Sequence, residues 1–179
     1  MHMHSRDALR SASPDRDDAV AATFLFADLC GFTEYTARHG DHVAADLAVG
    51  FHRRVSELSA AAGCDVVKSI GDAVMVHSCD CRVAVALACR ILAMGERDGL
   101  PAICIGIDSG PAVARHGDWY GSTVNAAARL ADAAMPGELL MTERARAAVA
   151  GAGSVRLVAR GVRHLKGLPA LAVHTASAA

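Results

Sequence analysis

The chain has 179 residues, which is enough for one domain with a sizeable hydrophobic core. Its formal net charge of −1 gives no support for general attraction to nucleic acids or membranes, so any phosphate ligand must be held by local charges and backbone amides. No apolar stretch is long enough to span a bilayer and the first residues lack the apolar centre of a signal sequence, so we expect a cytoplasmic protein.

The first twenty residues are polar and mixed in charge, and we expect residues 1–20 to form a flexible N-terminal arm ahead of a single domain at 21–179. Hydrophobic periodicity then predicts the elements of that domain in chain order. They are a doubly buried strand at 23–27, helical structure over 33–62, a hairpin of strands at 64–70 and 73–77, a helix around 83–94, a strand at 103–113 interrupted at its glycines, a helix at 123–134, a short strand at 138–141, a helix at 142–150 and a final hairpin over 155–174.

The order of these elements indicates the fold class. A strand, helices, a hairpin, a helix, a strand and a helix, followed by smaller strands, predict an α+β fold. We expect a ferredoxin-like βαββαβ core, with helices packed on a largely antiparallel sheet, plus C-terminal β elements. Thr33 and Asp41 are candidate N-caps for the first helical segment.

The cysteines occur in apolar contexts that resemble strands or helices. Such contexts are typical of reduced core thiols, and we predict those in preference to a disulfide framework. The six residues are Cys30, Cys64, Cys79, Cys81, Cys89 and Cys104.

Asp28 follows the first predicted strand, where a buried carboxylate is costly unless it is paired or holds a metal. Gly31 permits a tight turn and the next helix begins within two residues, so free amides and the helix dipole favour an anion there. A carboxylate beside such amides can hold a divalent cation together with its phosphate. An aspartate that only caps the helix is the alternative for this segment.

Asp72 lies in the turn of the first predicted hairpin, where Asp after Gly is also ordinary turn chemistry. If that hairpin pairs with the first strand, Asp72 and Asp28 come close together. Two unpaired carboxylates at close range repel, and one or two divalent cations remove that cost. Magnesium or manganese is the natural choice for such oxygen ligands.

Basic and amide side chains complete a candidate site. Lys68 lies in an otherwise apolar strand one turn before Asp72, so it either solubilises an edge strand or points near the same pocket. Asn125 and Arg129 share a helix face otherwise dominated by alanine, from which the arginine can reach a phosphate with bidentate geometry. A surface salt bridge is the alternative for Arg129. Together these residues indicate a site for a metal-bound polyphosphate.

Six segments, in this order, resemble one family: FADLCGFT, VVKSIGDAVMV, GIDSG, GDWYGSTVNAAARL, PGELLMT and HLKGL. They are similar to the catalytic domain of class III nucleotidyl cyclases, and specifically to adenylyl cyclases of the bacterial and mycobacterial type. The resemblance covers residues 23–175, so it implies that 21–179 is a class III cyclase catalytic domain.

The resemblance implies roles for the individual residues. Asp28, Asp72 and the backbone carbonyl of Leu29 would bind two divalent cations, Mg²⁺ or Mn²⁺. Lys68 and Asp118 would read adenine, since lysine donates to N1 and aspartate accepts from the N6 amino group. The remaining implied substrate contacts are Asn125 to the ribose, Arg129 to the transition state, Lys166 to the outer phosphates, and Cys30, Gly31, Phe32 and Thr33 in the turn after Asp28.

The implied reaction converts ATP to 3′,5′-cyclic AMP and pyrophosphate at active sites shared across a head-to-tail homodimer, with no nucleic-acid or membrane partner. Departures from the family pattern are Ala73 in place of a common glycine and Leu168 where some relatives carry a second lysine. A guanylyl or relaxed-specificity cyclase is one alternative, against which Lys68 and Asp118 argue. A nucleotide-binding regulatory module without turnover is another.

Overall fold

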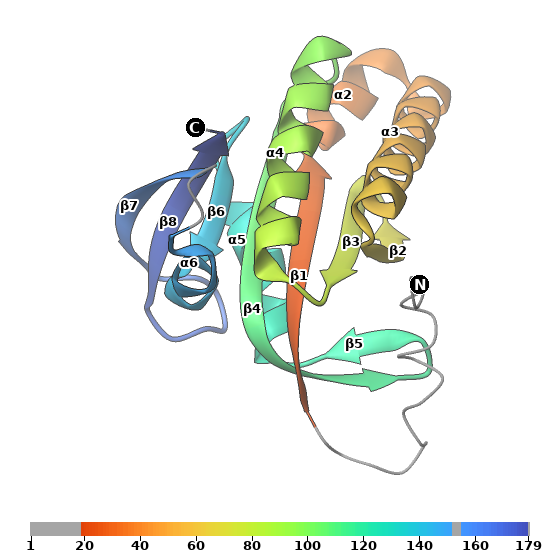
Figure 1. The fold of residues 1–179 in the computed structure, drawn as a ribbon. Coiled ribbons are helices and arrows are strands. Elements are labelled where there is room, and N and C mark those ends of the chain that lie inside the picture. The colour runs from red at the N-terminus through yellow and green to blue at the C-terminus, as the bar shows by residue number, and fades with distance from the viewer. Residues whose placement is uncertain (1–18, 152–154, 179) are drawn as a thin grey trace.

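The computed structural model describes residues 19–151 and 155–178. The expected arm at 1–20 therefore lies outside the described residues except for its last two. In chain order the elements are β1 (Val20–Leu29), α2 (Phe32–His39), α3 (Asp41–Ala62), β2 (Asp65–Ile70), β3 (Ala73–Ser78), α4 (Cys81–Arg97), β4 (Ile103–Arg115), β5 (Asp118–Tyr120), α5 (Ser122–Ala133), β6 (Leu139–Thr142), α6 (Glu143–Val149), β7 (Val155–Arg163) and β8 (Leu171–Ala178) (Figure 1).

The strands form an eight-stranded sheet in the order β2-β3-β1-β4-β6-β8-β7, with β5 paired to β4. Within the described sheet, β4 and β6 are parallel and the other neighbouring pairs are antiparallel. Helices α3 and α4 cover one face of the sheet, and α5 lies behind it in Figure 1. This arrangement confirms the predicted α+β class with a largely antiparallel sheet.

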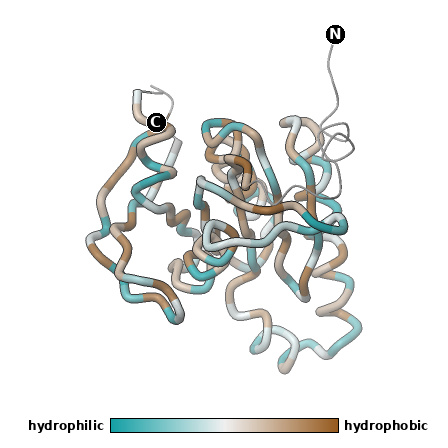
Figure 2. Tube along the Cα trace, turned by 90° about the horizontal axis from the view of Figure 1, so that it is seen from below, coloured by the Kyte–Doolittle hydropathy of each residue, from teal (hydrophilic) through white to brown (hydrophobic). Residues whose placement is uncertain are grey.

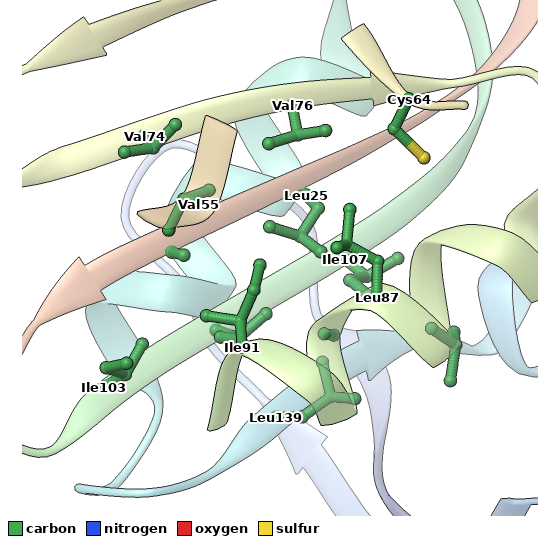
Figure 3. Close-up of a cluster of buried hydrophobic side chains, with 14 of the residues drawn as sticks. Leu25, Val55, Cys64, Val74, Val76, Leu87, Ile91, Ile103, Ile107 and Leu139 are labelled. Atoms are coloured by element: carbon green, nitrogen blue, oxygen red, sulfur yellow. The ribbon is translucent and has the colours of Figure 1, made fainter. Parts of the chain in front are cut away.

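Strand β1 is buried on both faces, as predicted, because its side chains alternate between two hydrophobic clusters. Leu25 and Leu29 join the larger cluster, which packs the sheet against Val55 and Ile91 of the covering helices (Figure 3). Phe24 faces the opposite side, where α5 covers the sheet. Strand β1, which carries Asp28 near its end, is thus held from both sides.

Helix α5 lies very close to β4, and Gly106 makes this possible. A Cβ atom at Gly106 would lie 2.1 Å from the Ala127 carbonyl oxygen and 2.3 Å from the Ala131 amide nitrogen. Those distances exclude any side chain at this position without a shift of the helix. The sequence analysis expected the glycines to interrupt this strand. That expectation is wrong, because β4 runs unbroken through Gly106.

The first helical region differs from the prediction at its helix starts. The helical structure expected over 33–62 consists of two helices separated by Gly40, whose φ is 85°. The N-caps are glycines at positions 31 and 40, and neither provides a side-chain cap, so the caps predicted at Thr33 and Asp41 are wrong. Glycines with positive φ reverse the chain here without a capping side chain.

The prediction that the cysteines are reduced is wrong for one pair. Cys30 and Cys104 form a disulfide with a Cα–Cα distance of 6.0 Å. The antiparallel pairing of β1 with β4 explains it, since Asp28 lies opposite Cys104 and the chain continues two residues to Cys30. A sequence separation of 74 residues concealed this proximity. The other four cysteines are free.

Along the described chain, hydrophobic and hydrophilic residues alternate in short stretches (Figure 2). Accordingly, none of the described helices combines the length and the apolar character that a bilayer-spanning segment requires.

Candidate active site

The structure brings Asp28 and Asp72 together at the end of β1. Strand β3 pairs antiparallel with β1, with Ala27 opposite Val74, and the Gly71–Asp72 turn that precedes β3 therefore lies next to the β1 terminus. The two carboxyl groups are close enough for Asp72 to raise the pKa of Asp28. The sequence predicted this meeting on the condition that the hairpin pairs with the first strand, and that pairing is present.

Burial, and then the neighbouring Asp72 carboxylate, raise the pKa of Asp28 to about 7. Asp132 adds to this rise, whereas the backbone amide of Leu29 stabilises the charged form. A divalent cation would remove the repulsion between the two carboxylates, so the pair fits such an ion. Within the described ranges, His, Cys, Asp and Glu side chains form no metal-binding group of three or more, so further ligands would come from backbone or substrate oxygens.

We expect the metal-free protein to lose stability as the pH rises from 3.8 to about 7, because folding keeps a proton on Asp28 that the unfolded chain releases. The folded-state pKa is the higher one, so the folded state binds more protons throughout this window. The Asp28→Asn variant should lack this pH-dependent loss of stability. Its unfolding free energy should therefore exceed that of the wild type by an amount that grows with pH. Urea unfolding in the presence of a chelator, repeated across this pH range, measures the unfolding free energies. The variant Asp46→Asn, at an exposed position, is the control. A difference between Asp28→Asn and the wild type that does not change with pH would contradict the prediction.

A cavity of about 410 Å³ joins the β1 terminus to α5 and to the loop between β7 and β8. Four residues predicted for the site line it: Asp28, Asn125, Arg129 and Lys166. The volume suits a ligand of nucleotide size. The full lining is Phe26, Asp28, Ile70, Ala73, Asn125, Ala128, Arg129, Ala131, Asp132, Lys166, Gly167 and Leu168.

Arg129 forms a surface salt bridge whose partner the sequence analysis did not name. Its Nη1 lies 2.9 Å from Oδ2 of Asp132, one helical turn further along α5. Both side chains are about half exposed, so the ion pair contributes little to stability. The i, i+3 spacing in the sequence would have indicated this pair. Arg129 thus forms the surface salt bridge that the sequence analysis gave as the alternative. It also lines the cavity that contains other residues of the predicted site.

Lys68 and Asp118 meet across two strands far apart in sequence. The Lys68 Nζ donates a 2.5 Å hydrogen bond to Oδ2 of Asp118, and the Trp119 amide donates to Oδ1 at 2.8 Å. These donors hold the pKa of Asp118 below its usual value. The pair does not line the 410 Å³ cavity, so one chain does not gather all its candidate residues around one space.

An aromatic stack fixes the strand that carries Asp118. The Trp119 ring stacks on His77 of β3 with centroids 4.6 Å apart, and contacts Phe24 of β1 edge-to-face at 5.4 Å. Burial lowers the pKa of His77, which favours the neutral imidazole within this stack. The short β5 is thereby anchored to the sheet that carries Lys68. No sequence pattern had indicated these contacts.

The turn after Asp28 has the predicted shape but not all of its predicted groups are free. Gly31 has a φ of 71° and is the N-cap of α2, ahead of Phe32 and Thr33. The Cys30 amide, however, donates to the Ala102 carbonyl oxygen at 2.7 Å, and its sulfur is bonded to Cys104. Cys30 therefore contributes neither an amide nor a thiol to a ligand in this state.

Two curated relatives are similar in sequence. An adenylate cyclase of Streptomyces griseus is 37% identical over 106 residues, covering 59% of this chain and 27% of that protein. A pH-sensitive adenylate cyclase of Mycobacterium tuberculosis (strain CDC 1551 / Oshkosh) is 34% identical over 160 residues, covering 84% of this chain and 39% of that protein. The chain thus spans about a third of the length of these relatives.

The fold has a similar solved structure. The guanylate cyclase domain of RhGC from Catenaria anguillulae, in complex with GTP, matches with a TM-score of 0.81 at 21% identity, covering 91% of this chain and 99% of that chain. The family model described as adenylate and guanylate cyclase catalytic domain matches residues 15–176. This chain belongs to that family, the adenylate and guanylate cyclase catalytic domains.

Proposed function

We propose that this chain is an adenylyl cyclase domain that converts ATP to 3′,5′-cyclic AMP and pyrophosphate. The observation that carries the proposal is the meeting of the Asp28 and Asp72 carboxyl groups at the end of β1. Asn125, Arg129 and Lys166 lie on the same side of the chain, in the cavity that Asp28 lines. This combination suits a triphosphate bound together with its metal.

The chain's own groups have distinct roles in the proposed reaction. Asp28, Asp72 and the Leu29 carbonyl would hold two divalent cations, Mg²⁺ or Mn²⁺, which when bound lower the pKa of the ribose 3′-hydroxyl and offset charge on the triphosphate. Asn125 orients the ribose. Arg129 meets the charge that develops on the α-phosphate, an interaction commonly worth about 3 kcal/mol.

The Lys68–Asp118 pair supports selectivity for adenine. Its ammonium and carboxylate lie side by side, presenting one donor and one acceptor. Adenine offers N1 as acceptor and its N6 amino group as donor, whereas guanine offers the opposite pattern at these positions. Guanylate and adenylate cyclase domains share one fold, so the fold does not determine which nucleotide is bound. We therefore assign the selectivity for ATP over GTP to this pair.

Within one chain, the candidate residues do not surround a single space. Asp28 and Arg129 line one cavity, while Lys68 and Asp118 lie outside it. We propose that two copies pack head to tail with this cavity at their interface, so that the aspartates of one subunit face the purine-reading pair, Asn125 and Arg129 of the other. A closed two-fold dimer would then hold two complete sites.

The direct test is to incubate the purified protein with Mn²⁺ and either ATP or GTP and to identify the products by chromatography. We expect 3′,5′-cyclic AMP from ATP, and little cyclic product from GTP. Nucleotide binding without a cyclic product from either would refute turnover and favour the regulatory module. Comparable products from both nucleotides would favour the relaxed-specificity cyclase.

We expect Lys68→Glu combined with Asp118→Cys to lower kcat/KM for ATP by about tenfold to a hundredfold, since each hydrogen-bonding group then opposes the adenine edge. Preference should move towards GTP. Steady-state kinetics with both nucleotides measures the change, and the exposed Arg97→Glu serves as a control for altered charge. Unchanged ATP kinetics in a folded double variant would show that these residues do not read the purine.

A further inference from the structure

We propose that Cys30 and Cys104 form a redox-modification site. Its oxidation state sets how firmly residues 29–33, here called the 29–33 turn, hold the metal-bound nucleotide. The inference rests on the function proposed above and adds a regulatory input to that same site. The oxidised pair is the state described by the structure.

The disulfide lies where the β1–β4 ladder ends. Leu29 and Ile103 form the last pair of that ladder, and Cys30 continues beyond it into the turn. Beyond the ladder, the 2.7 Å hydrogen bond from the Cys30 amide to Ala102 and the disulfide itself attach this part of the turn to β4. Breaking the disulfide therefore loosens the turn while the ten paired positions of the two strands remain.

The same disulfide also contacts the other half of the site. The Cys104 sulfur lies 3.5 Å from the carbonyl oxygen of Ala134, the residue that caps the end of α5. Helix α5 carries Asn125 and Arg129. One covalent link thus contacts both the turn next to the cation-binding aspartate and the helix that carries the phosphate-binding arginine.

Exposure determines the order of the exchange reaction. Cys30 is partly exposed and Cys104 is only 8% exposed, so a small-molecule disulfide such as oxidised glutathione meets Cys30 first. The Cys30 thiolate attacks one of its sulfurs, forming a mixed disulfide and releasing one small thiolate. The Cys104 thiolate then attacks the Cys30 sulfur and releases the second. The protein loses two electrons and two protons, and the small disulfide gains them as two thiols.

The remaining cysteines do not provide an equivalent site. Cys64 and Cys81 are buried, and burial raises the pKa of Cys81 to about 11, which suppresses its thiolate. Burial also raises the pKa of Cys89. Cys79 is exposed and free, so it is the matched control for nonspecific thiol chemistry.

The experiment compares protein oxidised with glutathione disulfide and protein reduced with a phosphine, each freed of reagent before assay. Peptide mapping by mass spectrometry should find the Cys30–Cys104 link only in the oxidised sample. Reduction should raise KM for Mn²⁺–ATP by about threefold to tenfold with little change in kcat, because a loosened turn must be ordered on binding. Cys30→Ser and Cys104→Ser should resemble the reduced protein under both treatments, whereas Cys79→Ser should respond like the wild type.

Two results would overturn the proposal: the pair stays reduced in excess glutathione disulfide, or the link forms and breaks without changing KM. Absence of cyclic product in both redox states would instead refute the proposed function. In that case the affinity for a nonhydrolysable ATP analogue with Mn²⁺, measured by calorimetry, decides the redox proposal. A redox-dependent affinity lost in Cys30→Ser supports it, and equal affinities refute it.

Discussion

Replacing Asp72 with alanine is expected to abolish cyclic AMP formation, lowering kcat by about a thousandfold or more, while the fold persists. One remaining carboxylate at the β1 terminus cannot hold two divalent cations beside a triphosphate. Asp28→Ala should have the same effect. The metal-free variants should be no less stable than the wild type, because each removes one of two mutually repelling carboxylates. Product quantification at saturating Mn²⁺, together with thermal unfolding, measures both quantities.

The exposed carboxylate of Asp46 on α3 provides a matched control, since Asp46→Ala removes the same charge away from the cavity. That variant should retain wild-type activity. Residual metal-dependent turnover in a folded Asp28→Ala or Asp72→Ala protein would show that the two-cation arrangement is wrong.

Mixing inactive Asp72→Ala chains with inactive Arg129→Ala chains is expected to restore activity. In a head-to-tail dimer a heterodimer carries both substitutions in one site and leaves the other intact. Random exchange of equal amounts of the two chains makes about half of the dimers heterodimers, and each heterodimer has one working site out of two. Activity per total protein should therefore reach about a quarter of the wild-type value. Cyclic AMP formation after co-refolding or co-expression of differently tagged chains measures it.

The control mixture is Asp72→Ala with Asp28→Ala, which places both substitutions in the same half of the proposed site. It should remain inactive, because each shared site then lacks one aspartate. If purified Asp72→Ala/Arg129→Ala heterodimers are inactive as well, the sites are not shared between subunits.

Local patterns in the sequence predicted most of the fold. The hairpin around Gly71 and Asp72 and the doubly buried first strand were both confirmed, because alternation and turn chemistry act over a few residues. The meeting of Asp28 with Asp72 followed from that hairpin together with its expected pairing to the first strand. The helix starts at Gly31 and Gly40 were missed, since a positive-φ glycine replaces the side-chain cap that sequence rules look for.

Contacts that depend on tertiary pairing could not be predicted in the same way. The Cys30–Cys104 bond requires the β1–β4 register, which joins residues 74 positions apart. The aromatic stack of Trp119 on His77 likewise depends on the short β5 folding back along β4. These contacts join segments that carry candidate site residues, and no local period encodes them.

Strand β4 is a common support for otherwise separate parts of the proposed machinery. It seats α5 against Gly106, is bonded to the 29–33 turn through Cys104, and pairs with the strand that carries Asp118. A displacement of this one strand would therefore misalign the cation ligands, the arginine helix and the purine-reading pair simultaneously. Substitutions in its interior could thus impair turnover from positions that never touch the nucleotide.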